Sequence, residues 1–131
     1  MSIDFSDIDT TMKTVLAIYQ EAWKDTSQWK SNMDIALHLL EKLRSEHPAN
    51  TIVLTNLGAV LSDLGQHKKA LLRLLKAVNL GFEDRNLYFN IGVVKMNINE
   101  ERATAMTYFD RARELQAHAM TIEAYFDPHG R

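Results

Sequence analysis

The stretch TNLGAVLSDLGQHKKALLRLLKAV, residues 55–78, decides the fold. Its apolar residues recur at helical spacing, yet Gly58 and Gly65 interrupt it. A glycine inside a helix costs roughly 1 kcal/mol relative to alanine, so each needs a reason. The triplet Asn-Leu-Gly that ends at Gly58 recurs as Asn-Ile-Gly ending at Gly92, 34 residues later. A period near 34 residues with two helices per unit predicts stacked helical hairpins.

The two glycines are predicted to have different structural roles. Gly58, in the first helix of a hairpin, lets the second helix approach closely, and Ala70 and Ala77 are small for the same reason. Gly65 lies where the first helix must end, because glycine accepts the left-handed conformation common after a helix end. Asn99 could end the next first helix in a similar way.

The rest of the chain has the same character. Apolar residues follow helical spacing from Met12 to Leu115, and few stretches alternate long enough to form a strand. The 131 residues form one domain by ordinary size, and 46% are hydrophobic. The sequence therefore predicts an all-α domain with helices of about 12–16 residues.

Composition excludes several functional classes. The net charge of −2 does not favour nucleic acid or an anionic membrane, and the absence of cysteine excludes disulfides and thiolate metal sites. The acidic start does not resemble a signal peptide, and no apolar run reaches the length of a membrane span, so a cytoplasmic protein is expected. The chain contains no phosphate-binding loop and no hydrolase or metalloprotease motif, so we expect neither an enzyme nor a cofactor. Glu114 and His118, four residues apart, could touch a metal, but two ligands do not make a site.

Residues 51–84 and 85–119 resemble the tetratricopeptide repeat family. The matching positions are Leu54, Leu57, Gly58, Leu61, Gly65, Ala70, Leu74 and Ala77, then Tyr88, Ile91, Gly92, Ala105, Phe109 and Ala112. Phe82 replaces the family's terminal proline, and Lys95 replaces an aromatic residue. Residues 17–50 match as a degenerate first repeat, through Ala36, Leu40, Leu43 and Pro48.

The resemblance implies a right-handed helical-hairpin solenoid of about three repeats, with residues 120–131 as cap and tail. We expect residues 118–126 to form a short capping helix, since terminal repeats expose an apolar face, and Asp127–Arg131 to be a loose end. Alternatively, this aromatic segment docks on another molecule. The helix near residues 9–24 either forms half a hairpin or lies in the groove.

In this family the first helices of successive hairpins line a concave groove that binds peptides or partner helices. By resemblance, the lining residues here are Ile52, Thr55, Asn56, Ala59, Ser62, Asp63, Asn86, Phe89, Asn90, Val93, Met96 and Asn97. The amides of Asn56 and Asn90 could hydrogen-bond an extended peptide backbone, while Phe89, Val93 and Met96 offer an apolar patch. Alternatively, Phe89 or Val93 packs against the N-terminal helix. A clamp for a C-terminal carboxylate is not expected, because only Asn56 fits that pattern.

The residues Lys68, Lys69, Arg73 and Lys76 form a basic run that binds an acidic partner or is a solvated outer face. Three functions stay open: a peptide-binding interaction module, a dedicated chaperone or immunity protein for one secreted protein, and a subunit that self-associates, for example as a homodimer.

Overall fold

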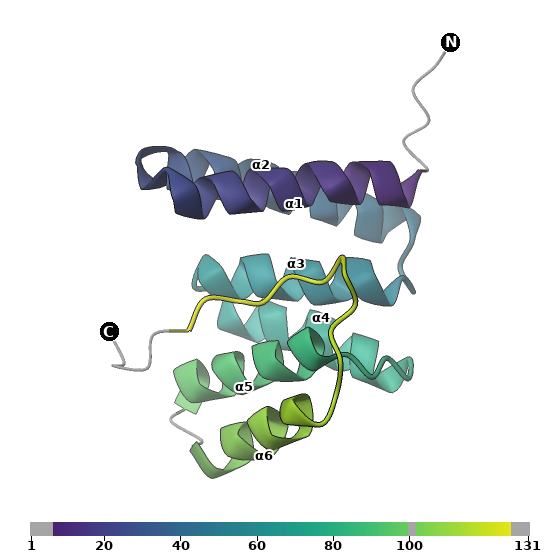
Figure 1. Ribbon diagram of the computed structural model, residues 1–131, viewed down its shortest axis with the longest axis vertical. Coiled ribbons are helices and arrows are strands. Elements are labelled where there is room, and N and C mark those ends of the chain that lie inside the picture. Colours follow the sequence, from purple (N-terminus) through teal and green to yellow (C-terminus); the bar gives the residue numbers. More distant parts are fainter. Residues whose placement is uncertain (1–6, 100–101, 127–131) are drawn as a thin grey trace.

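The computed structural model describes residues 7–99 and 102–126 (Figure 1). The described chain is all-α, as predicted, and contains no strand. Its helices are α1 (Ile8–Lys24), α2 (Trp29–Glu46), α3 (Thr51–Asp63), α4 (His67–Asn79), α5 (Arg85–Asn99) and α6 (Arg102–Arg113), and a short 3-10 turn, Thr26–Gln28, joins α1 to α2.

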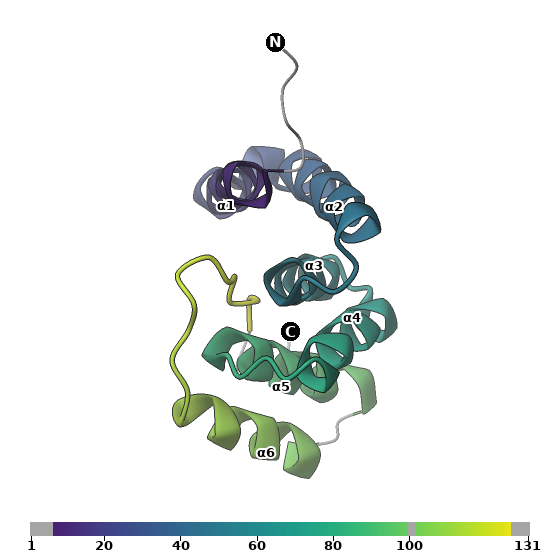
Figure 2. The same ribbon diagram turned by 90° about the vertical axis from the view of Figure 1, so that its right-hand side faces the viewer.

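The helices pack as three consecutive pairs, α1 with α2, α3 with α4, and α5 with α6. The pairs follow one another along the long axis, with α2 against α3 and α4 against α5 (Figure 2). Helix α3 also contacts α5, so these two first helices lie side by side. The N-terminal helix therefore forms half of a pair with α2 rather than lying alone in a groove.

Local sequence signals begin and end the helices. The side chains of Asn50 and Asp84 each accept a hydrogen bond from the backbone N–H three residues later, at 3.0 and 3.1 Å, which caps α3 and α5. Gly65 follows α3 with φ of +81°, and Gly81 follows α4 with φ of +88°. Both conformations suit glycine, so the prediction that Gly65 ends the first helix is confirmed.

Gly58 and Gly92 allow close packing within the second and third pairs. A Cβ atom at Gly58 would lie 2.5 Å from Cγ of Leu74, and one at Gly92 would lie 2.6 Å from Cε1 of Phe109. Real side chains do not approach so closely. The interpretation of Gly58 as a packing glycine is confirmed, and Gly92 repeats it one hairpin later.

The capping helix predicted for residues 118–126 is wrong. After α6 ends at Arg113, the chain forms a turn at Ala119–Met120 and then runs extended to Phe126. Its path passes beside α5 and α3 (Figures 1 and 2). The predicted loose end, Asp127–Arg131, lies outside the described residues. Residues 118–126 are called the C-terminal segment below.

Candidate functional site

The C-terminal segment lies along α3 and α5 like a bound strand (Figures 1 and 2). Ile122 and Ala124 are 3% and 2% exposed, whereas Glu123 and Tyr125 face solvent. Alternate residues of an extended chain point to opposite sides, and this pattern has that period. Ile122 and Ala124 join the hydrophobic core that the helices form.

Asn56 of α3 and Asn90 of α5 bind the backbone of this segment. Asn56 donates from Nδ2 to the carbonyl of Met120 at 2.8 Å and accepts from the N–H of Ile122 at 2.7 Å. Asn90 donates to the carbonyl of Ile122 at 2.9 Å and accepts from the N–H of Ala124 at 2.8 Å. The two asparagines thus make the same pair of bonds, displaced by two residues, which is one period of an extended strand.

Asn86 and Asp84 hold the start of the segment. Asn86 donates from Nδ2 to the carbonyl and to Oγ1 of Thr121, both at 3.1 Å. Asp84 uses Oδ2 to cap α5, and its Oδ1 accepts from the N–H of His118 at 2.5 Å and from Oγ1 of Thr121 at 3.3 Å. Asp84 is buried and joins the helix start to the segment.

Asp63 and Tyr19 hold the far part of the segment. Asp63 accepts from the N–H of Tyr125 at 2.9 Å and from the hydroxyl of Tyr19 at 2.6 Å. That hydroxyl also lies 3.2 Å from the carbonyl oxygen of Glu123. Burial raises the pKa of Asp63 to about 6, although both hydrogen bonds act in the opposite direction. Burial, together with the charge of Asp63, also raises the pKa of Tyr19.

Aromatic rings of α1 and α2 cover the same end. The ring of Tyr125 stacks on Trp23 with centroids 5.0 Å apart and planes 21° apart. Trp23 in turn meets Trp29 and Tyr19 edge to face, with centroids 5.6 and 6.3 Å away. The first pair of helices therefore contributes a stacking surface to the site.

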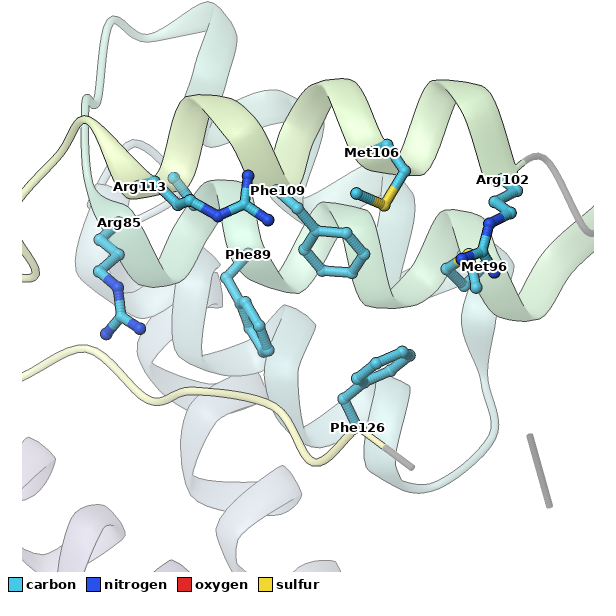
Figure 3. A pocket seen from close by; sticks show the side chains of 9 residues that line it. Arg85, Phe89, Met96, Arg102, Met106, Phe109, Arg113 and Phe126 are labelled. Carbon is cyan, nitrogen blue, oxygen red and sulfur yellow. The ribbon is translucent and has the colours of Figure 1, made fainter. Parts of the chain in front are cut away.

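A pocket of about 390 Å³ lies between α5 and α6, next to the end of the segment (Figure 3). Phe89, Phe109 and Phe126 lie together at its centre, and the ring of Phe109 is 5.3 Å from Phe89 and 5.7 Å from Phe126. The remaining lining residues are Arg85, Met96, Arg102, Met106, Ala112 and Arg113. Among the described residues, the pocket is therefore lined by apolar side chains and by three arginines, with no acidic side chain.

The predicted groove residues lie together on α3 and α5, but most are covered. Those buried are Thr55, Asn56, Ala59, Ser62, Asn86, Asn90 and Val93; those partly buried are Ile52, Asp63, Phe89 and Met96; Asn97 is exposed. Four of them, Asn56, Asp63, Asn86 and Asn90, hydrogen-bond the C-terminal segment. Thr55 instead donates to a carbonyl of its own helix at 2.8 Å.

Sequence reasoning missed Asp84, Tyr19 and Trp23 as parts of this site. Asp84 had a readable signal, since an aspartate directly before a helical pattern is typical of an N-cap. Tyr19 and Trp23 had only the signal of a core-facing helix, because nothing local indicates which segment will pack on that face.

Two other predicted features lie elsewhere. Lys68, Lys69 and Lys76 are exposed on α4, which lies on the other side of the helix stack from the C-terminal segment (Figure 2). Helix α6 ends at Arg113, so Glu114 and His118 do not share the helix on which their possible contact with a metal was based. Within residues 7–99 and 102–126, no three His, Asp or Glu side chains gather to hold a metal. No helix in this part of the chain is long and apolar enough to cross a bilayer.

Comparison with family models, with curated proteins and with solved structures found no match to this chain. The resemblance to tetratricopeptide repeats therefore rests on the residues and their spacing.

Proposed function

We propose that this chain is a non-enzymatic protein–protein interaction module that holds an extended segment of a partner protein along α3 and α5. The observation that carries the proposal is the repeated pair of backbone hydrogen bonds made by Asn56 and Asn90. Each amide uses both its donor and its acceptor, as a neighbouring strand would. Side chains that bind backbone groups suit an extended peptide of any source.

A tetratricopeptide-like solenoid is part of the same proposal. Gly58 and Gly92 make the same close approach to the second helix of their pairs, 34 residues apart. Asn56 and Asn90 repeat at the same interval and contact backbone positions two residues apart. One repeat of the helical stack then corresponds to two residues of the bound segment.

In this proposal the C-terminal segment is the chain's own occupant of the groove, and a partner displaces it. A tethered segment has an effective concentration on the order of millimolar, so a partner with the same contacts would compete poorly. A successful partner needs contacts that the segment does not make. The pocket that Phe126 lines offers them, since the groove residues Phe89 and Met96 line it too (Figure 3).

The test uses a full-length variant with a weakened C-terminal segment. The substitutions Ile122→Pro and Ala124→Pro remove the two N–H groups that donate hydrogen bonds to Asn56 and Asn90. We call this double variant the open variant. A fluorescent peptide with the sequence of residues 117–126 is titrated and followed by anisotropy. We expect the open variant to bind it at least tenfold more tightly than the wild type does.

Two controls make the result specific. Adding Asn90→Ala to the open variant should abolish peptide binding, whereas adding Asn97→Ala, on the same helix but exposed, should not. Circular dichroism checks that every variant keeps its helices. A folded open variant that binds no peptide would show that the groove does not accept a segment in trans.

Self-association is the second candidate function, because the groove fits a segment that another copy of the chain also carries. Exchange of this segment between two copies would give a dimer without new contacts. Sedimentation at micromolar concentrations decides this point: a wild-type dimer that becomes a monomer in the open variant would favour a self-associating subunit.

A further inference from the structure

We infer that the groove selects partner segments with a medium-sized aliphatic residue in the place of Ile122, alanine or glycine in the place of Ala124, and an aromatic residue directly after it. The inference rests on the proposed function and adds the sequence class of the partner. The C-terminal segment serves as the template, because its side chains show which positions face inward.

The place of Ile122 requires a buried aliphatic side chain. Ile122 is 3% exposed and belongs to the hydrophobic core cluster. Both its N–H and its carbonyl are bonded, to Asn56 and Asn90, so its backbone cannot shift to make room. A β-branched residue also favours the extended conformation required here. Loss of such a side chain should weaken binding by about tenfold to a hundredfold.

The place of Ala124 accepts only a small side chain. Ala124 is 2% exposed, and its N–H lies 2.8 Å from Oδ1 of Asn90, which holds its backbone against α5. Protein interiors are closely packed, so a larger side chain would push the backbone away from the helix. That displacement would also break the neighbouring bond from Tyr125 to Asp63.

The two outward positions differ from each other. Tyr125 is 57% exposed but stacks on Trp23, so an aromatic residue there adds affinity. Glu123 is exposed, and its carboxylate forms a long ion pair, at 3.8 Å, with the exposed guanidinium of Arg85. Exposed ion pairs contribute little, so the groove does not select the type of residue in the place of Glu123.

A peptide panel tests the pattern against the open variant by anisotropy. The parent peptide has the sequence of residues 117–126, and each other peptide carries one change. We expect Ile122→Val and Glu123→Gln to bind within about threefold of the parent. We expect Ala124→Leu to bind at least tenfold more weakly, Ala124→Gly to keep measurable binding, and Tyr125→Ala to lose about threefold to tenfold.

The same changes in the tethered segment give a second readout. In the otherwise wild-type chain, Ala124→Leu should speed hydrogen exchange at the amides of Ile122 and Tyr125, whereas Glu123→Gln should leave it unchanged. If the parent and the Ala124→Leu peptides bind equally well, the inference is overturned and the proposed function stands. If no peptide binds, the parent included, the proposed function fails and the inference about partners fails with it.

Discussion

Replacing Asn90 with alanine should detach the C-terminal segment while leaving the helices folded. Asn90 is fully buried and makes two hydrogen bonds to the segment, at 2.9 Å to the carbonyl of Ile122 and at 2.8 Å from the N–H of Ala124. Alanine can make neither bond. The two backbone groups must then stay buried without a partner or leave the groove for water.

The size of the effect follows from these two bonds. Each contributes about 1 kcal/mol net, and each buried group left without a partner costs about 1–3 kcal/mol. The free energy that holds the segment in place should therefore fall by about 2–4 kcal/mol. Since 1.4 kcal/mol is a factor of ten, the open population should rise by about 30-fold or more.

Hydrogen exchange by NMR measures this change at the amides of Ile122, Ala124 and Tyr125. The control is Asn97→Ala, seven residues further along α5, where the asparagine is exposed. Both substitutions change helix propensity in the same way, so their difference reports the contacts of Asn90. Equal exchange in the two variants would refute the assignment of Asn90 as a ligand of the segment.

Three further predictions concern packing, pH and the pocket. Gly58→Ala should lower the free energy of unfolding by about 1–3 kcal/mol, because the added methyl group overlaps Leu74. Urea unfolding measures this change, and an unchanged midpoint would contradict close packing between Gly58 and Leu74. The pKa of Asp63 is raised to about 6, so its carboxyl group binds a proton more tightly in the folded state than in the unfolded state. Protonation of Asp63 therefore stabilises the fold fully below pH 3.8, and this stabilisation is lost as the pH rises through about 6. The stability of Asp63→Asn, measured by urea unfolding, should therefore rise relative to that of the wild type between pH 4 and 7, because His67 titrates in both proteins. A difference in unfolding free energy that does not change with pH would contradict burial of the carboxyl group. A peptide that extends the residue 117–126 sequence with leucine and glutamate should bind the open variant more tightly than the unextended peptide does. Arg102→Glu should remove that gain in affinity. Equal affinities of the extended and unextended peptides would show that the pocket is not used.

The repeated elements of the fold could be predicted because they are set by local geometry. Gly58 and Gly92 carry a visible 34-residue period, and the structure places each against the side chain of the facing helix. Gly65 marks a helix end through a conformation that other residues rarely adopt. Such signals depend on a few neighbouring residues, so the sequence displays them directly.

The conformation of the C-terminal segment could not be predicted in this way. Its residues are compatible with a helix, and its period-two pattern, from Met120 to Ala124, is too short to indicate a strand. Contacts with distant residues decide its conformation: a helix there would leave the buried amides of Asn56 and Asn90 without the backbone groups that they bind. Two inward asparagines at the repeat interval are the signal that an extended segment lies beside them.

The central claim is that the C-terminal segment binds the groove as a peptide ligand does. A protease site placed in the exposed linker after α6, near Gln116 and Ala117, allows the segment to be cut from the folded chain. Size-exclusion chromatography and calorimetry then measure whether the cut segment stays bound. We predict that it remains associated at high concentration, dissociates on dilution with a defined Kd, and rebinds when added back. A cut chain that unfolds, or a folded one for which the released segment has no measurable affinity, would contradict the claim.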